Sequence, residues 1–202
     1  MDFKESETLK ILTRAFSAEC QDGAFYQFMA DEATQQKLSN VATILKQLAT
    51  NEMAHAKIFY DYISSKKEDG FDMVEIKATF PMKSGNLIEM LKSKQENEER
   101  QSNSVYPKFA KIAEKEGYND LANKFLQIGK IELCHSDVLS QLYEMIINKT
   151  IYNKEVDTLW KCLNCGHEDL LKKSWKKCPL CDKDQGYVKI NLCGSSENFK
   201  RR

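Results

Sequence analysis

The sequence predicts a mainly α protein: an antiparallel four-helix bundle with a long crossover, followed by a small β domain built on metal-binding knuckles. Three observations predict this fold class. Apolar residues recur at alternating steps of three and four over four long stretches between residues 5 and 148. The 202 residues include only 3 Pro and 8 Gly, too few for a turn-rich β protein. Near the C-terminus, two Cys-x-x-Cys pairs lie close together.

Each helix is predicted from its seam, which is the line of positions that recur at steps of three and four along one face of the helix. The seams span residues 9–30, 41–62, 87–112 and 121–146. Short polar breaks join the first seam to the second and the third to the fourth, whereas residues 66–85 are long enough to cross the bundle end to end. Pro107 lies inside the third pattern and predicts a kink or a local break there.

The chain is expected to divide where the helical pattern ends. We assign the bundle to residues 1–148, a polar linker to 149–158, a small metal domain to 159–192 and a tail to 193–202.

The composition and the N-terminal sequence indicate which classes of partner and which cellular location to expect. Thirty Lys and Arg balance thirty Asp and Glu, which argues against a nucleic-acid partner held by a general basic field. The first ten residues lack the apolar core of a signal peptide, and no stretch is apolar for long enough to span a membrane. We therefore expect a cytoplasmic protein with no membrane partner, in which clustered Cys residues hold a metal.

The seam of the bundle becomes polar midway along every helix. Ionised carboxylates in an apolar bundle are costly without a counter-charge, and a dinuclear metal centre supplies one. Two Glu-x-x-His motifs plus one Glu from each of the other two helices make the donor set of a di-iron carboxylate bundle. Such ligands suit iron or manganese, and zinc also fits. The polar seam residues are Glu19, Glu52, His55, Glu98, Gln101, Glu132 and His135.

Simpler explanations exist for each motif on its own. A single Glu-x-x-His occurs by chance on solvated helix faces, and a buried His can simply pair with a buried Glu. Two motifs on different helices, both in the seam, favour the metal centre.

Tyr26 and Tyr106 fall near the same height along the bundle as the polar seam residues. They either hydrogen-bond to ligand carboxylates and quench radicals or merely fill the core.

The two Cys-x-x-Cys pairs are separated by twelve residues and predict a tetrahedral four-sulfur site for one iron or zinc. Gly166 and Asp182 follow the pairs and suit the left-handed turn of a knuckle. The predicted ligands are Cys162, Cys165, Cys178 and Cys181. The remaining cysteines have no ligand spacing and are expected to be packing residues or free thiols: Cys20, Cys134 and Cys193.

Together these motifs resemble the rubrerythrin family. The resemblance covers residues 6–192 and rests on the stretches 16–19, 51–56, 105–110 and 131–135 and on the rubredoxin-like segment 160–181. It implies a ferritin-like di-iron domain, with two Fe, followed by a rubredoxin-like domain with one Fe or Zn. It also implies a homodimer in which the rubredoxin-like domain of one subunit approaches the di-iron site of the other.

The resemblance further implies an activity. It is that of a non-haem di-iron peroxidase that reduces hydrogen peroxide to water in oxidative-stress defence. Electrons would come from a reductase or a rubredoxin, linked to NAD(P)H through that separate reductase, and pass through the Cys-ligated iron. Glu52 and Glu132 are the expected bridges between the two metals.

One position departs from the family pattern, which has two glutamates one turn apart before Tyr106. Alignment on Tyr106 places them at Glu98 and Gln101, whereas the neighbouring pair Glu96 and Glu99 leaves the seam. A carboxamide is neutral and a weaker oxygen donor than a carboxylate. We therefore hypothesise that the redox-linked iron movement of the family is weakened or absent in this chain.

Two other functions compete with the peroxidase. Gln101 favours a ferroxidase or iron-handling ferritin-like protein. With a glutamine in place of the second glutamate, the remaining six ligands form a more symmetric site of the ferritin type. An attached electron carrier argues against iron storage. A zinc-ribbon binding module on a metal-stabilised bundle is the third interpretation, and visible absorption and metal content would separate it from the other two.

Overall fold

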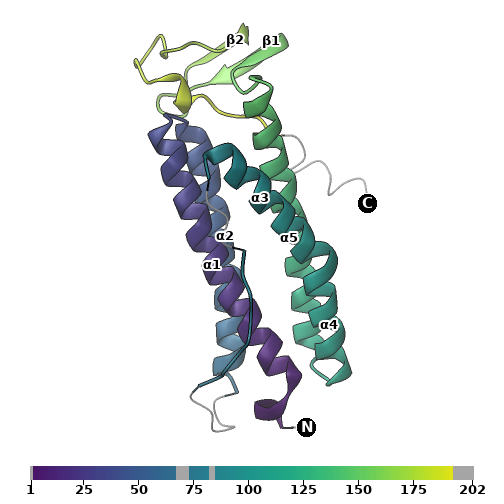
Figure 1. Cartoon of the computed structure of the whole chain (residues 1–202). Coiled ribbons are helices and arrows are strands. Elements are labelled where there is room, and N and C mark those ends of the chain that lie inside the picture. Colours follow the sequence, from purple (N-terminus) through teal and green to yellow (C-terminus); the bar gives the residue numbers. More distant parts are fainter. Residues whose placement is uncertain (1, 67–72, 82–84, 193–202) are drawn as a thin grey trace.

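The computed structural model describes residues 2–66, 73–81 and 85–192. Helices run antiparallel along one elongated bundle, and a small β unit lies across one end of it (Figure 1). The helices are α1 (Glu7–Gln35), α2 (Ser39–Ser64), α3 (Leu87–Arg100), α4 (Tyr106–Lys115) and α5 (Asn119–Ile147), with a 3-10 turn, η1 (Phe3–Glu5), before α1. The predicted fold class is confirmed.

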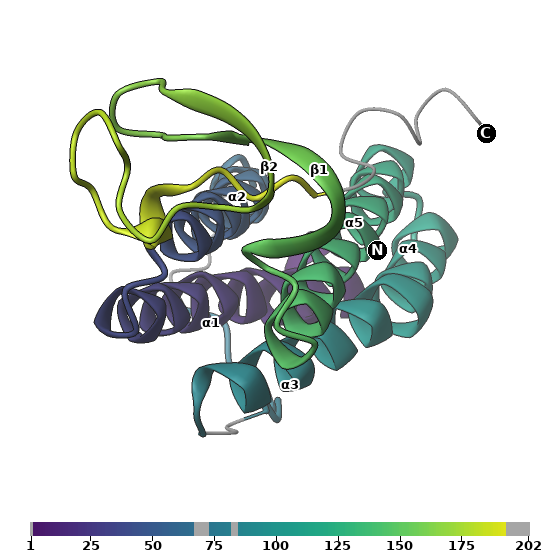
Figure 2. The same ribbon diagram turned by 90° about the horizontal axis from the view of Figure 1, so that it is seen from above.

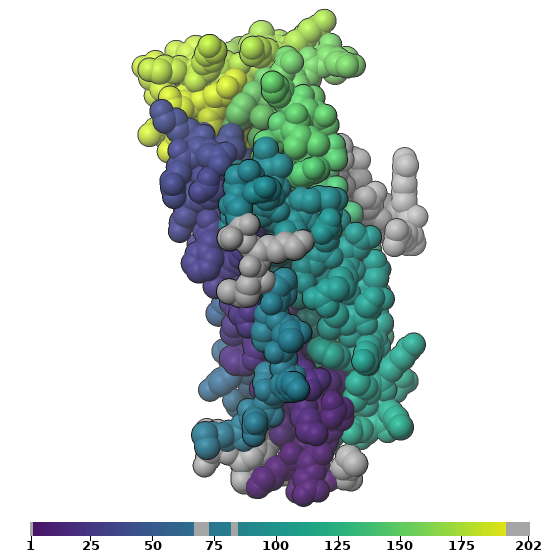
Figure 3. Space-filling view, viewed as in Figure 1, coloured from purple at the N-terminus to yellow at the C-terminus, as the bar shows by residue number. Residues whose placement is uncertain are grey.

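The bundle consists of two helical hairpins that face each other. Helix α1 packs along α2, and α3 and α4 together pack along α5. The segment 73–81, which has neither helix nor strand, belongs to the crossover between the hairpins and runs along the front of the bundle (Figure 3). None of the helices in the described ranges is long and apolar enough to cross a membrane.

The third helical stretch is interrupted, as Pro107 predicted, but the interruption lies directly before the proline. A π-helical segment, η3 (Gln101–Val105), separates α3 from α4. Pro107 sits in the first turn of α4, where its missing N–H leaves no helical hydrogen bond unmade. A π segment inserts an extra residue into a helix and commonly occurs at functional sites.

Two hydrophobic clusters fill the bundle on either side of a buried polar layer. One cluster joins the start of α1 and the end of α2 to α4 and the start of α5, around Phe59 and Phe125. The other joins the second half of α1 and the first half of α2 to α3 and the second half of α5, around Leu45 and Leu139. The predicted seam glutamates and histidines lie between the two clusters.

The β unit holds the four predicted cysteine ligands. Strands β1 (Asn153–Lys161) and β2 (Glu168–Lys173) pair antiparallel, with Lys161 opposite Glu168. Because β1 begins at Asn153, the second half of the expected linker 149–158 is strand instead, paired with β2. The expected tail 193–202, with Cys193, lies outside the described residues.

The β unit docks on the turn between α1 and α2, as Figure 2 shows from above. Its 3-10 turn, η4 (Gln185–Tyr187), approaches this turn so closely that a Cβ on Gly186 would lie 2.0 Å from the carbonyl oxygen of Lys37. The backbone N–H of Ile190 donates to Asn40 Oδ1 at 2.6 Å in a buried hydrogen bond. A glycine at 186 is therefore a steric requirement of this docking.

Candidate metal centres

Four helical stretches bring two overlapping groups of metal-ligating atoms together in the polar layer. Within each group, one ligand atom of every residue lies within 4.8 Å of the others, and every residue is buried. The first group is Glu19, Glu52, His55 and Glu132, and the second is Glu52, Glu98, Glu132 and His135. Glu52 and Glu132 belong to both groups, as the two carboxylates expected to bridge would.

The two halves of this cluster are built alike. Each hairpin supplies one Glu from its first helix and a Glu-x-x-His motif from its second. Tyr26 follows Glu19 by seven residues, whereas Tyr106 follows Glu98 by eight. The π segment η3 lies inside the longer spacing and accommodates the extra residue, so that both phenols face the cluster.

The two tyrosines hydrogen-bond crosswise between the hairpins. Tyr26 Oη on α1 donates to Glu98 Oε1 on α3 at 2.6 Å, and Tyr106 Oη on α4 donates to Glu19 Oε1 on α1. Both phenols are fully buried, and burial together with the nearby carboxylates raises the pKa of each well above its ordinary value. Of the two interpretations left open for these tyrosines, this geometry favours hydrogen bonding to the carboxylates.

Both imidazoles present Nδ1 to the cluster. His55 Nδ1 lies 3.1 Å from Glu19 Oε2, and His135 Nδ1 lies 3.0 Å from Glu132 Oε2. Burial alone would lower the pKa of each imidazole, but the surrounding carboxylates raise it to about 12 for His55 and about 10 for His135. Without a metal, protonated imidazoles therefore offset part of the negative charge of the carboxylates.

The fit to a metal pair rests on buried carboxylate oxygens that meet either an imidazole or no donor at all. Glu52 Oε1 lies 3.1 Å from His135 Nδ1 and Glu132 Oε1 lies 3.1 Å from His55 Nδ1, whereas Glu98 Oε2 is buried and accepts no hydrogen bond. Burial also raises the pKa of Glu19, and neighbouring negative charges add to the effect. Two dications would neutralise four carboxylates, bind Glu98 Oε2 and replace the imidazole protons that now face Glu52 and Glu132, so the residues present fit a dinuclear centre.

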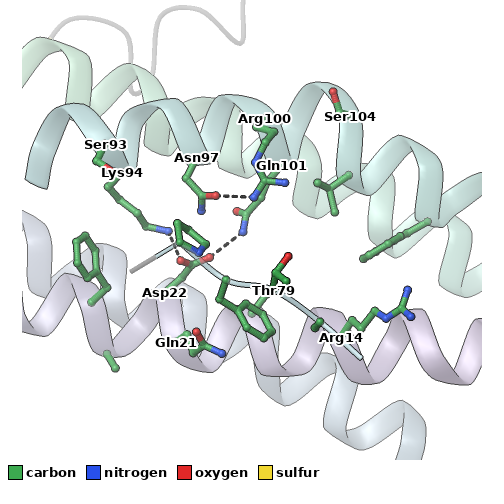
Figure 4. Close-up of a pocket in the computed structure, with 18 of the residues that line it drawn as sticks. Arg14, Gln21, Asp22, Thr79, Ser93, Lys94, Asn97, Arg100, Gln101 and Ser104 are labelled. Atoms are coloured by element: carbon green, nitrogen blue, oxygen red, sulfur yellow. Dashed lines mark hydrogen bonds and ion pairs between the residues drawn. The ribbon is translucent and has the colours of Figure 1, made fainter. Parts of the chain in front are cut away.

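Gln101 directs its amide nitrogen to Asp22 on α1. Its Nε2 donates to Asp22 Oδ2 at 2.8 Å, and its Oε1, although buried, accepts no hydrogen bond. Asp22 on α1 also pairs with the buried ammonium of Lys94 on α3 at 2.6 Å (Figure 4). These three side chains line a cavity of about 820 Å³ between α1 and the α3–α4 stretch, beneath the segment 73–81.

Sequence reasoning missed three polar side chains around the cluster. Lys94 and Asp22 form the network just described, and Asn51 Nδ2 lies 3.3 Å from His135 Nε2. A metal on His135 Nδ1 leaves the proton on Nε2, so that the Asn51 carboxamide would then have to present its oxygen. Lys94 falls on the seam pattern, which was a usable signal, whereas no pattern marked Asp22 or Asn51.

The second metal site lies in the β unit, where the two predicted knuckles have matching geometry. Gly166 and Asp182 adopt the expected left-handed conformation, with φ of 79° and 56°. Their backbone N–H groups each donate at 2.9 Å to the carbonyl of the first Cys of the pair, Cys162 and Cys178 respectively. The knuckles therefore repeat one turn structure about a common centre.

The four sulfurs lie at the spacing of a tetrahedral site. Cys162 Sγ is 3.7 Å from Cys181 Sγ, and Cys165 Sγ is 3.6 Å from Cys178 Sγ. A metal–sulfur bond of about 2.3 Å gives a tetrahedral edge of about 3.8 Å. A backbone N–H from Lys183 lowers the pKa of the Cys181 thiol to about 6, which favours the thiolate that a metal binds. Cys20 and Cys134 lie outside every metal group among the described residues.

The sequence is similar to known proteins over most of its length. The Rubrerythrin family model matches residues 10–143. The chain belongs to the rubrerythrin family. A putative rubrerythrin of Methanocaldococcus jannaschii is 35% identical over 91% of this chain and 92% of its own length. A rubrerythrin of Porphyromonas gingivalis is 33% identical over 91% and 90%, and rubrerythrin-1 of Clostridium acetobutylicum is 31% identical over 97% and 98%.

Solved structures agree on the fold. Partially reduced nigerythrin matches with a TM-score of 0.61 at 22% identity, covering 93% of this chain and 90% of its own. A Desulfovibrio desulfuricans bacterioferritin matches with a TM-score of 0.60 at 21% identity, covering 73% and 84%. Rubrerythrins are generally oxidoreductases, and the cofactors of this chain are those of its family: a di-iron carboxylate–histidine centre and one Fe or Zn in a four-cysteine site.

Proposed function

We propose that this rubrerythrin is a non-haem di-iron peroxidase that reduces hydrogen peroxide to water in oxidative-stress defence. The observation that supports it is the presence, in one chain, of two overlapping carboxylate–histidine groups and a separate four-cysteine site. A centre that stores or binds iron has no need of a second site suited to one-electron transfer. The overall reaction takes one peroxide, two electrons and two protons to two waters.

We propose Glu19, Glu52, His55, Glu98, Glu132 and His135 as the ligands of the iron pair, with Glu52 and Glu132 as bridges. When bound, the pair supplies both electrons and Lewis acidity towards the peroxide oxygens. The protein fixes the ligand carboxylates from outside, because Tyr26 and Tyr106 each donate to one of their oxygens. The raised pKa of both phenols keeps these donors protonated at neutral pH.

The position of the β unit supports a homodimer. Helix α1 runs sixteen residues from Glu19 to Gln35, about 24 Å at 1.5 Å per residue, before it reaches the turn on which the β unit docks. Electron transfer weakens steeply over such distances. We therefore propose that the four-cysteine iron of one subunit serves the di-iron site of a second, and that a reductase or rubredoxin linked to NAD(P)H reduces it.

The test is anaerobic peroxide consumption by the iron-loaded protein, reduced through an NAD(P)H-dependent rubredoxin reductase. Cys165→Ser should abolish turnover with the reductase but leave a single turnover by the chemically reduced di-iron site. Cys134→Ser, which alters an exposed cysteine outside the metal groups, should leave both unchanged. A reduced wild-type protein with two irons in the bundle that does not consume peroxide would refute the proposal.

A ferroxidase is the second candidate, because Gln101 points to Asp22 and leaves a six-residue, symmetric ligand set. The two functions differ in their oxidant and their product. Ferrous iron added in excess under oxygen would be oxidised repeatedly and retained as a mineral by an iron-handling protein. A peroxidase would oxidise only its bound pair and would form no mineral.

A further inference from the structure

Lys94 is a lysine ammonium enclosed in the interior of the bundle beside the predicted iron ligands. The side chain is 3% exposed, and its Nζ lies 2.6 Å from Glu98 Oε1 and 2.6 Å from Asp22 Oδ1. Nζ also lies 4.9 Å from the centre of the Tyr26 ring. A buried ammonium persists only where fixed negative charge compensates for its lost hydration, and here two carboxylates from different helices provide that charge.

The two oxygens of Glu98 have different roles. Oε1 pairs with the Lys94 ammonium and also accepts a hydrogen bond from the Tyr26 hydroxyl, each at 2.6 Å. Oε2 is buried and accepts no hydrogen bond. Glu98 can therefore offer one oxygen to a metal while the other connects that metal to a positive charge of the protein. Glu98 belongs to only one of the two metal groups, so this connection is one-sided.

Asp22 and Gln101 hold the lysine in place. Asp22 uses one oxygen for Lys94 and the other for Gln101 Nε2, at 2.8 Å. Figure 4 shows the contacts from Gln101 in the π segment to Asp22 on α1 and on to Lys94 on α3, and Lys94 in turn pairs with Glu98 at the metal cluster. Three of these four residues, Gln101, Asp22 and Lys94, line the cavity of about 820 Å³, and the fourth, Glu98, belongs to the cluster.

We propose that Lys94, anchored by Asp22 and Gln101, is a positioning residue that places a permanent positive charge beside one iron and so favours the reduced pair. The proposal rests on the assignment of Glu98 as a ligand. The physical reason is Coulombic: the ammonium repels a ferric ion more strongly than a ferrous ion, and little water is present to screen it. Gln101 contributes by donating to Asp22, which a carboxylate at this position could not do without a proton.

The experiment is a redox titration of the iron-loaded protein, followed by absorption and Mössbauer spectroscopy. Lys94→Met keeps the length of the side chain but removes its charge. At the wild-type midpoint potential it should lower the ratio of reduced to oxidised di-iron sites by about tenfold or more. Lys94→Arg should keep that ratio close to the wild-type value. Lys92→Met, an exposed lysine on the same helix, is the matched control and should change nothing.

Asp22→Asn makes the proposal falsifiable even where Lys94→Met fails to load iron. It removes the negative charge of Asp22, while the Asn oxygen and Glu98 still accept from the ammonium, so it should shift the ratio in the opposite direction, towards the reduced pair. The proposal is overturned if Lys94→Met behaves like Lys92→Met, or if the Lys94→Met and Asp22→Asn variants shift in the same direction. Mössbauer signals of two irons per bundle in wild type, distinct from iron bound by the four cysteines, establish the site independently, and none of these readouts depends on peroxide turnover.

Discussion

Gly186 provides a test of how the β unit is attached to the bundle. A methyl group at this position would lie 2.0 Å from Lys37 O and 2.9 Å from Ser39 N, both of them backbone atoms that cannot rotate away. Gly186→Ala must therefore push the β unit off the turn between α1 and α2 by more than an ångström. Two features of the docking are lost with it, namely the burial of Ile190 and the hydrogen bond from its N–H to Asn40.

The magnitude follows from these two losses. Burial of an Ile side chain contributes about 1.5–3 kcal/mol and a buried hydrogen bond about 1 kcal/mol, so full undocking costs about 3 kcal/mol. In a chain of this size, such a loss lowers the melting temperature by about 6–12 °C. The direct assay is amide hydrogen exchange: the Ile190 N–H should be protected in wild type and exchange rapidly in Gly186→Ala.

Gly23→Ala is the matched control. Its added methyl would meet the Met53 Sδ at 3.1 Å, the flexible end of a half-exposed side chain that can move aside. We expect its melting temperature to stay close to that of wild type, with Ile190 still protected. If Gly186→Ala keeps both the Ile190 protection and the wild-type melting temperature, the close approach of the two backbones is wrong.

Three further predictions concern capping, the cysteine site and Gln101. Glu116 accepts hydrogen bonds from the first backbone N–H groups of α1, and these bonds lower the pKa of its carboxyl group. The contribution of Glu116 to stability is therefore present above the pKa that it has in the unfolded chain, and it is lost as the pH falls through its pKa in the folded protein. Glu116→Gln should lower the free energy of unfolding by about 1 kcal/mol at pH 7 and by much less at pH 3, as urea titrations at both pH values would show; an equal loss at both pH values would contradict this. Cys178→Ser should remove the metal of the β unit and its ordered structure, whereas Cys134→Ser should keep the metal, as metal analysis and hydrogen exchange would show; an ordered β unit without metal would contradict it. Gln101→Glu should lower the melting temperature of the metal-free protein, because it turns a hydrogen bond into repulsion from Asp22, and unchanged melting would show that the contact is not formed.

Much of the di-iron site could be predicted because its ligands repeat in the sequence at helical spacing. Glu52-x-x-His55 and Glu132-x-x-His135 are recognisable without a structure, since residues three apart lie on one helix face. Their place in an otherwise apolar seam also indicated burial. The four-cysteine site was predictable for a similar reason, because each knuckle is one short turn with its own sequence signal.

The remaining features depend on distance in space, which spacing along one helix does not report. Nothing in the sequence places Asp22 of α1 opposite Lys94 of α3, because their contact depends on how the two hairpins face each other. Pro107 predicted an interruption, but the sequence did not predict that it would be a π segment. The type of helix there depends on which face of the chain packs on α5 and on the cluster. The linker was assigned by its polarity, whereas pairing with β2 turned its second half into strand.

The sequence by itself therefore determined the fold class, which side chains are candidates to bind metal, and the order of the two candidate sites along the chain. These depend on local periodicity and on the high cost of burying unpaired charge, and both can be read from residue types. Only the tertiary structure decided that Glu98 keeps one oxygen free, that Gln101 turns to Asp22, and that Lys94 supplies a positive charge to Glu98. Those outcomes depend on angstrom-scale placement of side chains from different helices, because an ion pair or a hydrogen bond forms only at contact distance.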